Sequence, residues 1–263
     1  MELSPAKMLK QVNAAVHEAG EIILANWAEA KSIRHKGRVD LVTETDVAVE
    51  KELTAKLDKI LPEAGFLAEE TASGGDLQEA TWIVDPLDGT TNFAHGLPFV
   101  AISVALWYED DVVLGLIHLP RLEETFSALK GGGAHLNGEP ITVSGGSRLV
   151  ESLVATGFPY DIETKADGEV ERLKRILTTT RGIRRMGAAA VDLAYTACGR
   201  FEAFYETGLK PWDTAAGWLL VREAGGMVTT FEAQPYHPFA GSVLSSNGLI
   251  HRELSDLLIA PSG

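Results

Sequence analysis

The stretch Thr81–Phe93, TWIVDPLDGTTNF, decides how this sequence is interpreted. Its apolar start has the composition of a buried strand and ends at Asp85, and Asp88 follows across Pro86. Two carboxylates around a proline at the end of such a strand indicate either a tight turn or a metal site. The stretch alone does not separate these interpretations, so the rest of the chain has to.

The composition is that of a globular protein. The chain has 263 residues, of which 45% are hydrophobic and 23% charged. No apolar run approaches the ~20 residues that span a bilayer, and the start, MELSPAKMLK, lacks the basic-then-apolar order of a signal peptide. We therefore expect a cytoplasmic protein that does not bind a membrane. Its single cysteine, Cys198, excludes an intrachain disulfide.

The charge balance is strongly acidic. Acidic residues number 37 and basic residues 23, which gives a net charge of −14. Such a surface repels nucleic acid, so no nucleic-acid partner is expected. Carboxylates gathered in one cleft repel each other unless a cation joins them, and hard divalent cations prefer oxygen ligands.

The order of expected elements predicts an α+β fold with layered helices and sheets. The first half has helices over 5–29 and about 46–61, then the strands TWIVD, VAISVALWY, VVLGLIHL and ETFSALK and a hairpin at Asn137-Gly138. The second half alternates the strands SLVATG, RFEAFYE, MVTTF and SVLSS with helices over 166–180, 187–198, 212–224 and the C-terminus. The soft stretch VSGGSR separates the halves 1–145 and 146–263, and we expect a cleft between them within one compact catalytic unit.

Three acidic segments stand out: Glu69-Glu70, the run from Asp85 to Thr91, and Trp212-Asp213 at the head of a helix. Each has an ordinary explanation. A glutamate pair is usually a solvated edge, Asp-Gly is a common turn, and an aspartate in the first turn of a helix interacts favourably with the helix dipole. None of them indicates an active site by itself.

Together they form a chemically consistent set. A strand end followed by a proline can direct Asp85, Asp88 and the carbonyl of Leu87 toward one point, and Glu69 can add a further oxygen. Carboxylates and a carbonyl, without His or Cys, are typical of a Mg²⁺ site. The segment that begins at Gly89 resembles the start of a helix, where backbone N–H groups suit a phosphate.

Two of these segments resemble a known family. DPLDGTTNF and WDTAAG are similar to the two signatures of the inositol monophosphatase family of Mg²⁺-dependent, Li⁺-sensitive phosphatases. DLVTETD, LAEET and GAAAVDLAY extend the resemblance over nearly the whole chain. It implies a layered sandwich of alternating helix pairs and sheets, shared with fructose-1,6-bisphosphatase-like proteins, with the active site between the two halves. It also implies a homodimer.

The resemblance assigns roles by position. It implies two to three Mg²⁺ ions held by Glu69, Asp85, the Leu87 carbonyl, Asp88 and Asp213, with Asp85 bridging two of them. It makes Thr90 and Glu69 the catalytic residues that orient the attacking water. The substrate contacts that it implies are Asp88, Gly89, Thr90, Ala189, Glu206 and Asp213.

Two basic segments have more than one interpretation. The loop Arg34–Arg38 reads as a solvated segment, whereas the resemblance places Lys36 in a loop that closes on the metals. Arg184 and Arg185 suit either a structural salt bridge or a phosphate contact, and the latter would favour a bisphosphate substrate.

The sequence thus favours a phosphoric monoester hydrolase that acts on inositol 1-phosphate or a similar small polyol or sugar phosphate, with direct attack of a metal-activated water. Fructose-1,6-bisphosphatase, alone or as a dual activity, histidinol phosphatase and 3′-nucleotidase remain alternatives with the same chemistry. A regulatory protein-binding role on the same fold is the alternative from a different class.

Overall fold

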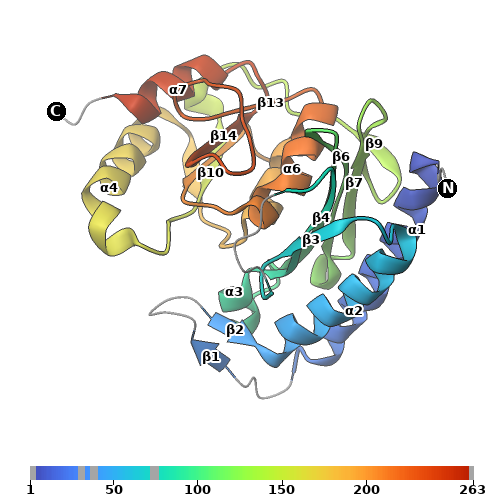
Figure 1. Ribbon diagram of the computed structural model, residues 1–263. Coiled ribbons are helices and arrows are strands. Elements are labelled where there is room, and N and C mark those ends of the chain that lie inside the picture. Colours follow the sequence, from blue (N-terminus) through green and yellow to red (C-terminus); the bar gives the residue numbers. More distant parts are fainter. Residues whose placement is uncertain (1–3, 29–32, 36–40, 72–76, 261–263) are drawn as a thin grey trace.

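The computed structural model describes residues 4–28, 33–35, 41–71 and 77–260, which form five stacked layers (Figure 1). A helix pair, a seven-stranded sheet, a second helix pair, a five-stranded sheet and a third helix pair follow one another in space. The α+β fold with layered helices and sheets that the sequence predicts is therefore confirmed.

The seven-stranded sheet has the order β3-β4-β5-β6-β7-β8-β9, in which only β3 and β4 pair in parallel. Its strands are β3 (Gly65–Ala68), β4 (Ala80–Asp88), β5 (Ala101–Tyr108), β6 (Asp111–Leu119), β7 (Glu124–Leu129), β8 (Gly133–Leu136) and β9 (Glu139–Ile141). Asn137 and Gly138 join β8 to β9 with φ values of 51° and 86°, so the predicted hairpin is present.

Helices α1 (Pro5–Ala25) and α2 (Glu44–Ile60) cover one face of this sheet. Ser4 caps α1, because its hydroxyl accepts the N–H of Lys7. Both helices turn apolar side chains toward the sheet and form a buried cluster that includes Val12, Val16, Ile23, Val49, Leu53, Trp82 and Val84. This burial places α2 directly behind β4, the strand that carries Asp85.

Helices α5 (Ala189–Ala197) and α6 (Pro211–Glu223) lie between the two sheets. All residues of α5 are buried, as expected for a helix that is apolar on every side. The two helices contact each other, β5 and β6 of the first sheet, and β14 of the second. The first turn of each helix is therefore held in the middle of the molecule.

The five-stranded sheet has the order β11-β10-β12-β14-β13. Its strands are β10 (Leu153–Thr156), β11 (Gly182–Arg184), β12 (Ala203–Thr207), β13 (Met227–Thr229) and β14 (Ser242–Ser246). Helices α4 (Ile162–Thr179) and α7 (His251–Ile259) form the outermost layer, and Val154, Ile176, Tyr205 and Leu254 are buried beneath it.

The structure departs from the sequence-based expectation mainly in short strands. β3, β11 and the pair β1 (Ile33–His35) and β2 (Leu41–Thr43) are three or four residues long, and such runs carry no detectable period. α1 ends at Ala25 rather than at residue 29. Lys36 lies outside the described residues. Over the described residues, no helix has the length and apolar character needed to cross a membrane.

Candidate active site

Asp85 and Asp88 lie within the end of β4, and the tight turn that the sequence suggests is instead a β-bulge. Asp85 pairs with Ser103 of β5 and Asp88 pairs with Ala101, so β4 has one more residue than its partner between these two pairs. A bulge is one of the few places where a sheet accepts a proline, because the ladder is locally interrupted there. Pro86 occupies this interruption.

The bulge brings both carboxylates to the same side of the sheet. In a regular strand, residues three apart point to opposite faces. Here the Val84 and Leu87 side chains both pack in the cluster beneath α1 and α2. Asp85 and Asp88 instead line a cavity together with residues of α5, α6 and β12. The extra residue therefore shifts the alternation of β4 by one position.

Glu69 follows β3 directly and is fixed from two directions. Its N–H donates to the carbonyl of Val84 at 3.1 Å, which extends the parallel pairing of β3 and β4 by one residue. The N–H of Glu70 donates to Oε2 of Glu50, a buried residue of α2, at 2.8 Å. Glu69 is therefore held between the sheet and α2, at the end of β4.

Asp213 enters the site from the first turn of α6. Its Oδ2 accepts the N–H of Lys210 at 2.6 Å, a bond that caps the helix and orients the carboxylate. One residue earlier, the carbonyl of Trp212 accepts the hydroxyl of Ser103 at 3.1 Å. Because Ser103 is the β5 partner of Asp85, this bond links the start of α6 to the strand beside the bulge.

The start of α5 is attached to the site through Asp88. The N–H of Ala190 donates to Asp88 Oδ2 at 2.7 Å. Asn92, which is buried in α3 (Thr90–His95), donates to the carbonyl of Met186 at 2.8 Å and so holds the loop that leads into α5. The predicted substrate residue Ala189 therefore lies beside Asp88.

All the predicted site residues line one cavity of about 380 Å³. They are Glu69, Asp85, Leu87, Asp88, Gly89, Thr90, Ala189, Glu206 and Asp213. The described wall also includes the loop 157–160 and two charged residues, Arg185 and Asp192. Six carboxyl groups thus share the described lining with one cationic side chain, an imbalance that a bound cation would relieve.

Burial and mutual repulsion raise the pKa values of the carboxyl groups in the cavity. Burial, followed by the charges of Glu69, Asp88 and Asp213, raises the pKa of Asp85 well above its ordinary value. Burial, followed by the charge of Asp213, raises the pKa of Glu206 to about 8, and Asp88 adds to the same effect. Asp88 and Asp213 act on both groups, so both lie near Asp85 and near Glu206.

Thr90 has a hydrogen-bond partner, Asp46, for which the sequence predicts no role in the site. The Thr90 hydroxyl lies 2.9 Å from Oδ1 of Asp46 and 3.1 Å from the carbonyl oxygen of Leu87. Its hydrogen is therefore directed to an acceptor inside the protein, and its lone pairs can accept a hydrogen bond from a water in the cavity. Asp46 also accepts the N–H and the hydroxyl of Thr43, at the start of α2.

Asp46 is hidden in the sequence because it reads as the third residue of a capping box, which accounts for an acidic residue at that position without catalysis. The structure shows that it is fully buried and reaches Thr90 from α2. The motif DLVTETD, which contributes to the family resemblance, is the signal that could have identified it.

The start of α3 offers backbone N–H groups to the cavity. Gly89 precedes the helix with a φ of 89°, and a Cβ at this position would lie 2.8 Å from the carbonyl oxygen of Phe99. Glycine is therefore required for conformation and for space. No side chain in the described part of the chain caps α3, and its first N–H groups can therefore bind an anion.

The donor set of this cavity fits a hard divalent cation, because every donor is a carboxylate or carbonyl oxygen. One oxygen each of Asp85, Asp88 and Asp213 accepts a backbone N–H, which orients the other oxygen. Burial raises the pKa of Asp88 to about 7 even though the N–H of Ala190 opposes the shift. Within the described part of the chain no three acidic, His or Cys side chains form a ready-made metal cluster.

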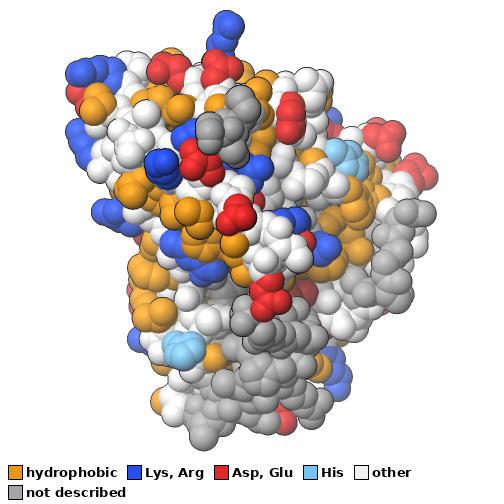
Figure 2. Space-filling model, turned by 90° about the vertical axis from the view of Figure 1, so that its left-hand side faces the viewer, with side chains coloured by type: hydrophobic (Ala, Val, Ile, Leu, Met, Phe, Trp, Pro, Cys, Tyr) orange, Lys and Arg blue, Asp and Glu red, His pale blue; other side chains and the backbone are white. Residues whose placement is uncertain are grey.

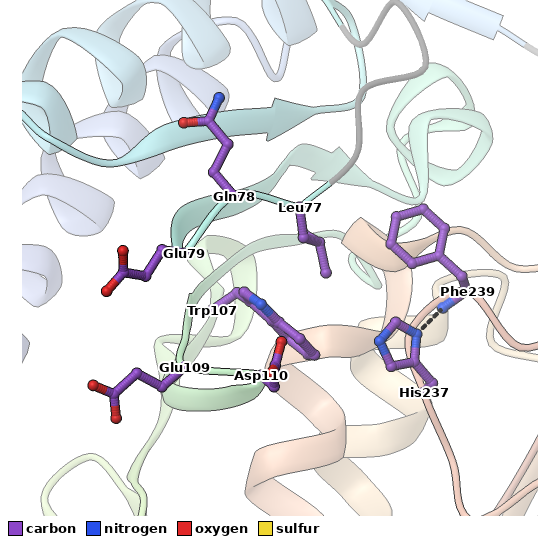
Figure 3. A pocket seen from close by; sticks show the side chains of 8 residues that line it. All are labelled: Leu77, Gln78, Glu79, Trp107, Glu109, Asp110, His237 and Phe239. Atoms are coloured by element: carbon purple, nitrogen blue, oxygen red, sulfur yellow. Dashed lines mark hydrogen bonds between the residues drawn. The ribbon is translucent and has the colours of Figure 1, made fainter.

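A second cavity, of about 610 Å³, lies elsewhere (Figure 3). Its lining is Leu77, Gln78, Glu79, Trp107, Glu109, Asp110, His237 and Phe239. The ring of Trp107 meets that of His237 edge-on at 5.2 Å, while Glu79 and Glu109 point away from this ring pair. None of the predicted site residues lines it, so we assign the chemistry to the smaller, acidic cavity.

Comparison with known proteins agrees with this assignment. The family model of the inositol monophosphatase family matches residues 4–262. The inositol-1-monophosphatase of Synechocystis sp. is 40% identical over 254 residues, 96% of this chain and 88% of that protein. Inositol monophosphatase 2 of Solanum lycopersicum is 43% identical over 240 residues, 89% of this chain and 91% of that protein.

Solved structures give the same result. The extragenic suppressor protein suhB of Bartonella henselae superposes with a TM-score of 0.90 at 36% identity and covers 96% of this chain and 98% of its own. The inositol monophosphatase of Anabaena (Nostoc) sp. superposes with a TM-score of 0.87 at 35% identity, over 97% of this chain and 96% of its own. This chain therefore belongs to the inositol monophosphatase family and is a phosphoric monoester hydrolase.

Proposed function

We propose that the protein is a Mg²⁺-dependent, Li⁺-sensitive phosphatase that hydrolyses inositol 1-phosphate or a similar small polyol phosphate. The observation that carries this proposal is the acidic cavity, which combines carboxylates of both halves with an uncapped helix start and the Thr90–Asp46 pair. Because both halves contribute, we further propose that 1–145 and 146–263 act as one catalytic unit.

The carboxylates of Glu69, Asp85, Asp88 and Asp213, with the Leu87 carbonyl, would hold two to three Mg²⁺ ions. The family is metal-dependent, and the lining of the cavity supports Mg²⁺ because it offers oxygen donors alone. When bound, Mg²⁺ supplies charge neutralisation at the phosphate and lowers the pKa of a water molecule.

Thr90 and Glu69 would orient the attacking water. The Thr90 hydroxyl gives its hydrogen to Asp46, which leaves its oxygen to accept a hydrogen from water. A proton can then pass from the water to Thr90 while the Thr90 proton passes to Asp46, which is consistent with general base catalysis. Asp46 therefore joins Thr90 and Glu69 in the proposed catalytic set.

The substrate would bind along the carboxyl groups that line the cavity. The phosphate would accept the N–H groups of Gly89 and Thr90 at the start of α3. Asp88, Ala189 and Glu206 would bind the hydroxyl groups of the polyol, and Asp213 would serve both the substrate and a metal ion. Glu206 lines the same cavity as Ala189, and the charges of Asp213 and Asp88 act on it, which supports its assignment to the organic part of the substrate.

Phosphate release from a panel of substrates tests this function. The panel contains inositol 1-phosphate, fructose 1,6-bisphosphate, histidinol phosphate, a 3′-nucleotide and p-nitrophenyl phosphate, with Mg²⁺ titrated and Li⁺ added. We expect Mg²⁺-dependent hydrolysis with the highest kcat/KM on inositol 1-phosphate, and inhibition by Li⁺. Preference for another hydroxylated phosphate would change the substrate, and hydrolysis without added or endogenous divalent metal would contradict the mechanism. The absence of any turnover would favour a regulatory binding role.

Arg185 gives fructose 1,6-bisphosphate the second place among the candidates. It belongs to the described lining of the cavity and lies over the ring of Phe158, with 5.9 Å between its guanidinium carbon and the ring centroid. A guanidinium at this position suits a second phosphate group. If it has this role, Arg185→Gln will lower kcat/KM for the bisphosphate more than for inositol 1-phosphate.

We also propose a homodimer. The side of the molecule that carries α4 exposes hydrophobic side chains (Figure 2), and the exposed ones include Tyr160, Val170 and Leu177. β11 lies at the edge of the five-stranded sheet and contacts α4. Such a surface supports association with a second copy. Sedimentation equilibrium is expected to give twice the chain mass of 28.3 kDa, and a monomer at micromolar concentration would exclude the dimer.

A further inference from the structure

Asp192 is a buried carboxyl residue of the cavity that has no role in the function proposed above. It lies in α5, three residues after Ala189, and therefore on the same face of that helix. Only 1% of the residue is exposed, yet it lines the cavity together with Ala189 and Glu206. It is the only charged residue of α5, whose other members are mostly apolar.

One oxygen of Asp192 lacks a hydrogen-bond partner. Oδ1 is fully buried, and no donor among the described residues contacts it. A buried polar atom without a partner is destabilising, and such atoms in native proteins usually receive a partner from water or from a ligand. Since Asp192 lines the cavity, a rotation of its carboxyl group would bring this oxygen to a donor on a bound molecule.

The surroundings of Asp192 indicate the chemistry of that donor. Besides burial, the charges of Glu206 and then Asp88 raise the pKa of Asp192, and the charge of Arg185 opposes them, so acidic neighbours outnumber the single cationic one among the named charges. A hydroxyl group suits such a place, because it can donate to an ionised carboxylate and accept from a protonated one. This match holds whichever of the two carboxyl groups carries a proton.

Glu206 is held in one orientation next to Asp192. Its carboxylate packs against Gly157, where a Cβ would lie only 2.1 Å from Oε2. Glu206 projects from β12 and Asp192 from α5, two elements that contact each other. Two carboxyl groups on rigid elements can thus receive two hydroxyl groups with a fixed separation.

We propose that Asp192 is a specificity-determining residue that binds a hydroxyl group of the substrate next to the hydroxyl bound by Glu206. The inference rests on the proposed function and narrows its substrate class to phosphates of polyols with neighbouring hydroxyl groups. The phosphate and the metal ions remain with the residues of the first half and with Asp213.

The test compares two substrates in Asp192→Ala, Asp192→Asn and the wild type. Inositol 1-phosphate carries ring hydroxyl groups, whereas p-nitrophenyl phosphate has none on its leaving group. We expect Asp192→Ala to lower kcat/KM for inositol 1-phosphate 10- to 100-fold more than for p-nitrophenyl phosphate, mainly through KM. Asp192→Asn, which keeps the size and one acceptor, should show a smaller difference. Asp256→Asn, on the exposed side of α7, is the matched control and should leave the ratio unchanged.

A set of singly deoxygenated inositol 1-phosphates identifies the contact. For the analogue that lacks the hydroxyl bound by Asp192, the wild type and Asp192→Ala should have the same kcat/KM. Equal losses on inositol 1-phosphate and p-nitrophenyl phosphate would show a structural role and overturn the proposal, as would no loss on either. If Asp192→Ala does not fold, the ratio in Asp192→Asn, with a thermal unfolding curve, decides in its place.

The proposed function is judged separately, by the wild type alone. If the wild type prefers another hydroxylated phosphate in the panel, inositol 1-phosphate is the wrong substrate. The ratio is then formed with that preferred substrate and p-nitrophenyl phosphate. An unchanged ratio in Asp192→Ala would overturn the role of Asp192 in this case as well.

Discussion

Near Glu69, the charges of three other carboxylates raise the pKa of Asp85. Near Glu206, by contrast, the pKa of Asp192 is raised mainly by the charges of Glu206 and Asp88. Asp85 accepts a backbone hydrogen bond within the β4 bulge, while one oxygen of Asp192 has no partner among the described residues. Both places bury carboxyl groups, but the first concentrates negative charge and the second leaves an unused hydrogen-bonding site. Buried carboxyl groups therefore differ in what they bind according to the number of carboxylates near them.

The largest effect is expected from Asp85→Asn, which removes a carboxylate repelled by the charges of Glu69, Asp88 and Asp213. Activity should fall by about 10³-fold or more, because a charged donor shared by the proposed metal sites becomes neutral. In the wild type, Mg²⁺ should raise Tm by relieving repulsion, and in the variant this increase should shrink. Kinetics and thermal unfolding with and without Mg²⁺ measure both, with Asp256→Asn as control. Full activity in Asp85→Asn would mean that Asp85 does not hold the metal.

Thr90→Ala addresses the attacking water. Without the hydroxyl that links the water to Asp46, kcat should fall about 10²-fold, while the Mg²⁺ concentration for half-maximal activity stays within a few fold. Asp46→Asn should cause a similar loss, since Thr90 would lose its acidic partner. The measurement is kcat as a function of Mg²⁺ concentration. A change in Mg²⁺ affinity without a change in kcat would assign Thr90 to metal binding instead.

Ser103→Ala tests how the start of α6, which carries Asp213, is positioned against β5. The variant loses the hydrogen bond from Ser103 to the carbonyl of Trp212, a loss of about 1 kcal/mol, and lets the start of α6 move relative to β5. We expect a decrease in kcat of about 5-fold on every substrate, because Asp213 follows Trp212. Rates on inositol 1-phosphate and p-nitrophenyl phosphate should fall equally. Selective loss on only one of these substrates would show that Ser103 affects the substrate and not the metal ligands.

The smallest effect is on stability, at Glu206. Folding raises the pKa of Glu206 from 4.5 to about 8, so the stabilisation due to its protonated form is fully present below pH 4.5 and is lost as pH rises through about 8. Glu206→Gln cannot ionise and should lose less stability between pH 5 and 9 than the wild type. Thermal unfolding across this range gives the difference in Tm. A constant difference would show that Glu206 is already ionised at pH 5.

Much of this arrangement is visible in the sequence. The long strands β5 and β6, the apolar stripes of α1 and α2 and the Asn137-Gly138 turn carry strong local signals, and the acidic segments together with the family signatures predict a single site. The β4 bulge is not visible, because it depends on pairing with β5, which lies outside the local window. Asp46 and Asp192 are missed for a similar reason. One reads as a helix cap and the other as part of an Ala-rich helix, and only burial reveals them.

The bulge at Pro86 also determines which substitutions, insertions and deletions β4 tolerates. The alternation of side chains has a different phase before and after it, so Trp82 and Val84 share a face with Leu87 instead of Pro86. Deleting one residue between Asp85 and Asp88 would give a regular strand that still presents both aspartates on one face, but it would remove the bend that the bulge imposes and so re-aim Asp88 and the Leu87 carbonyl. Substitutions in this segment change one contact at a time, whereas an inserted residue that the bulge does not absorb would exchange inside for outside over the whole strand end. We therefore expect an insertion or a deletion between these two aspartates to lower activity more than replacement of Pro86 or Leu87.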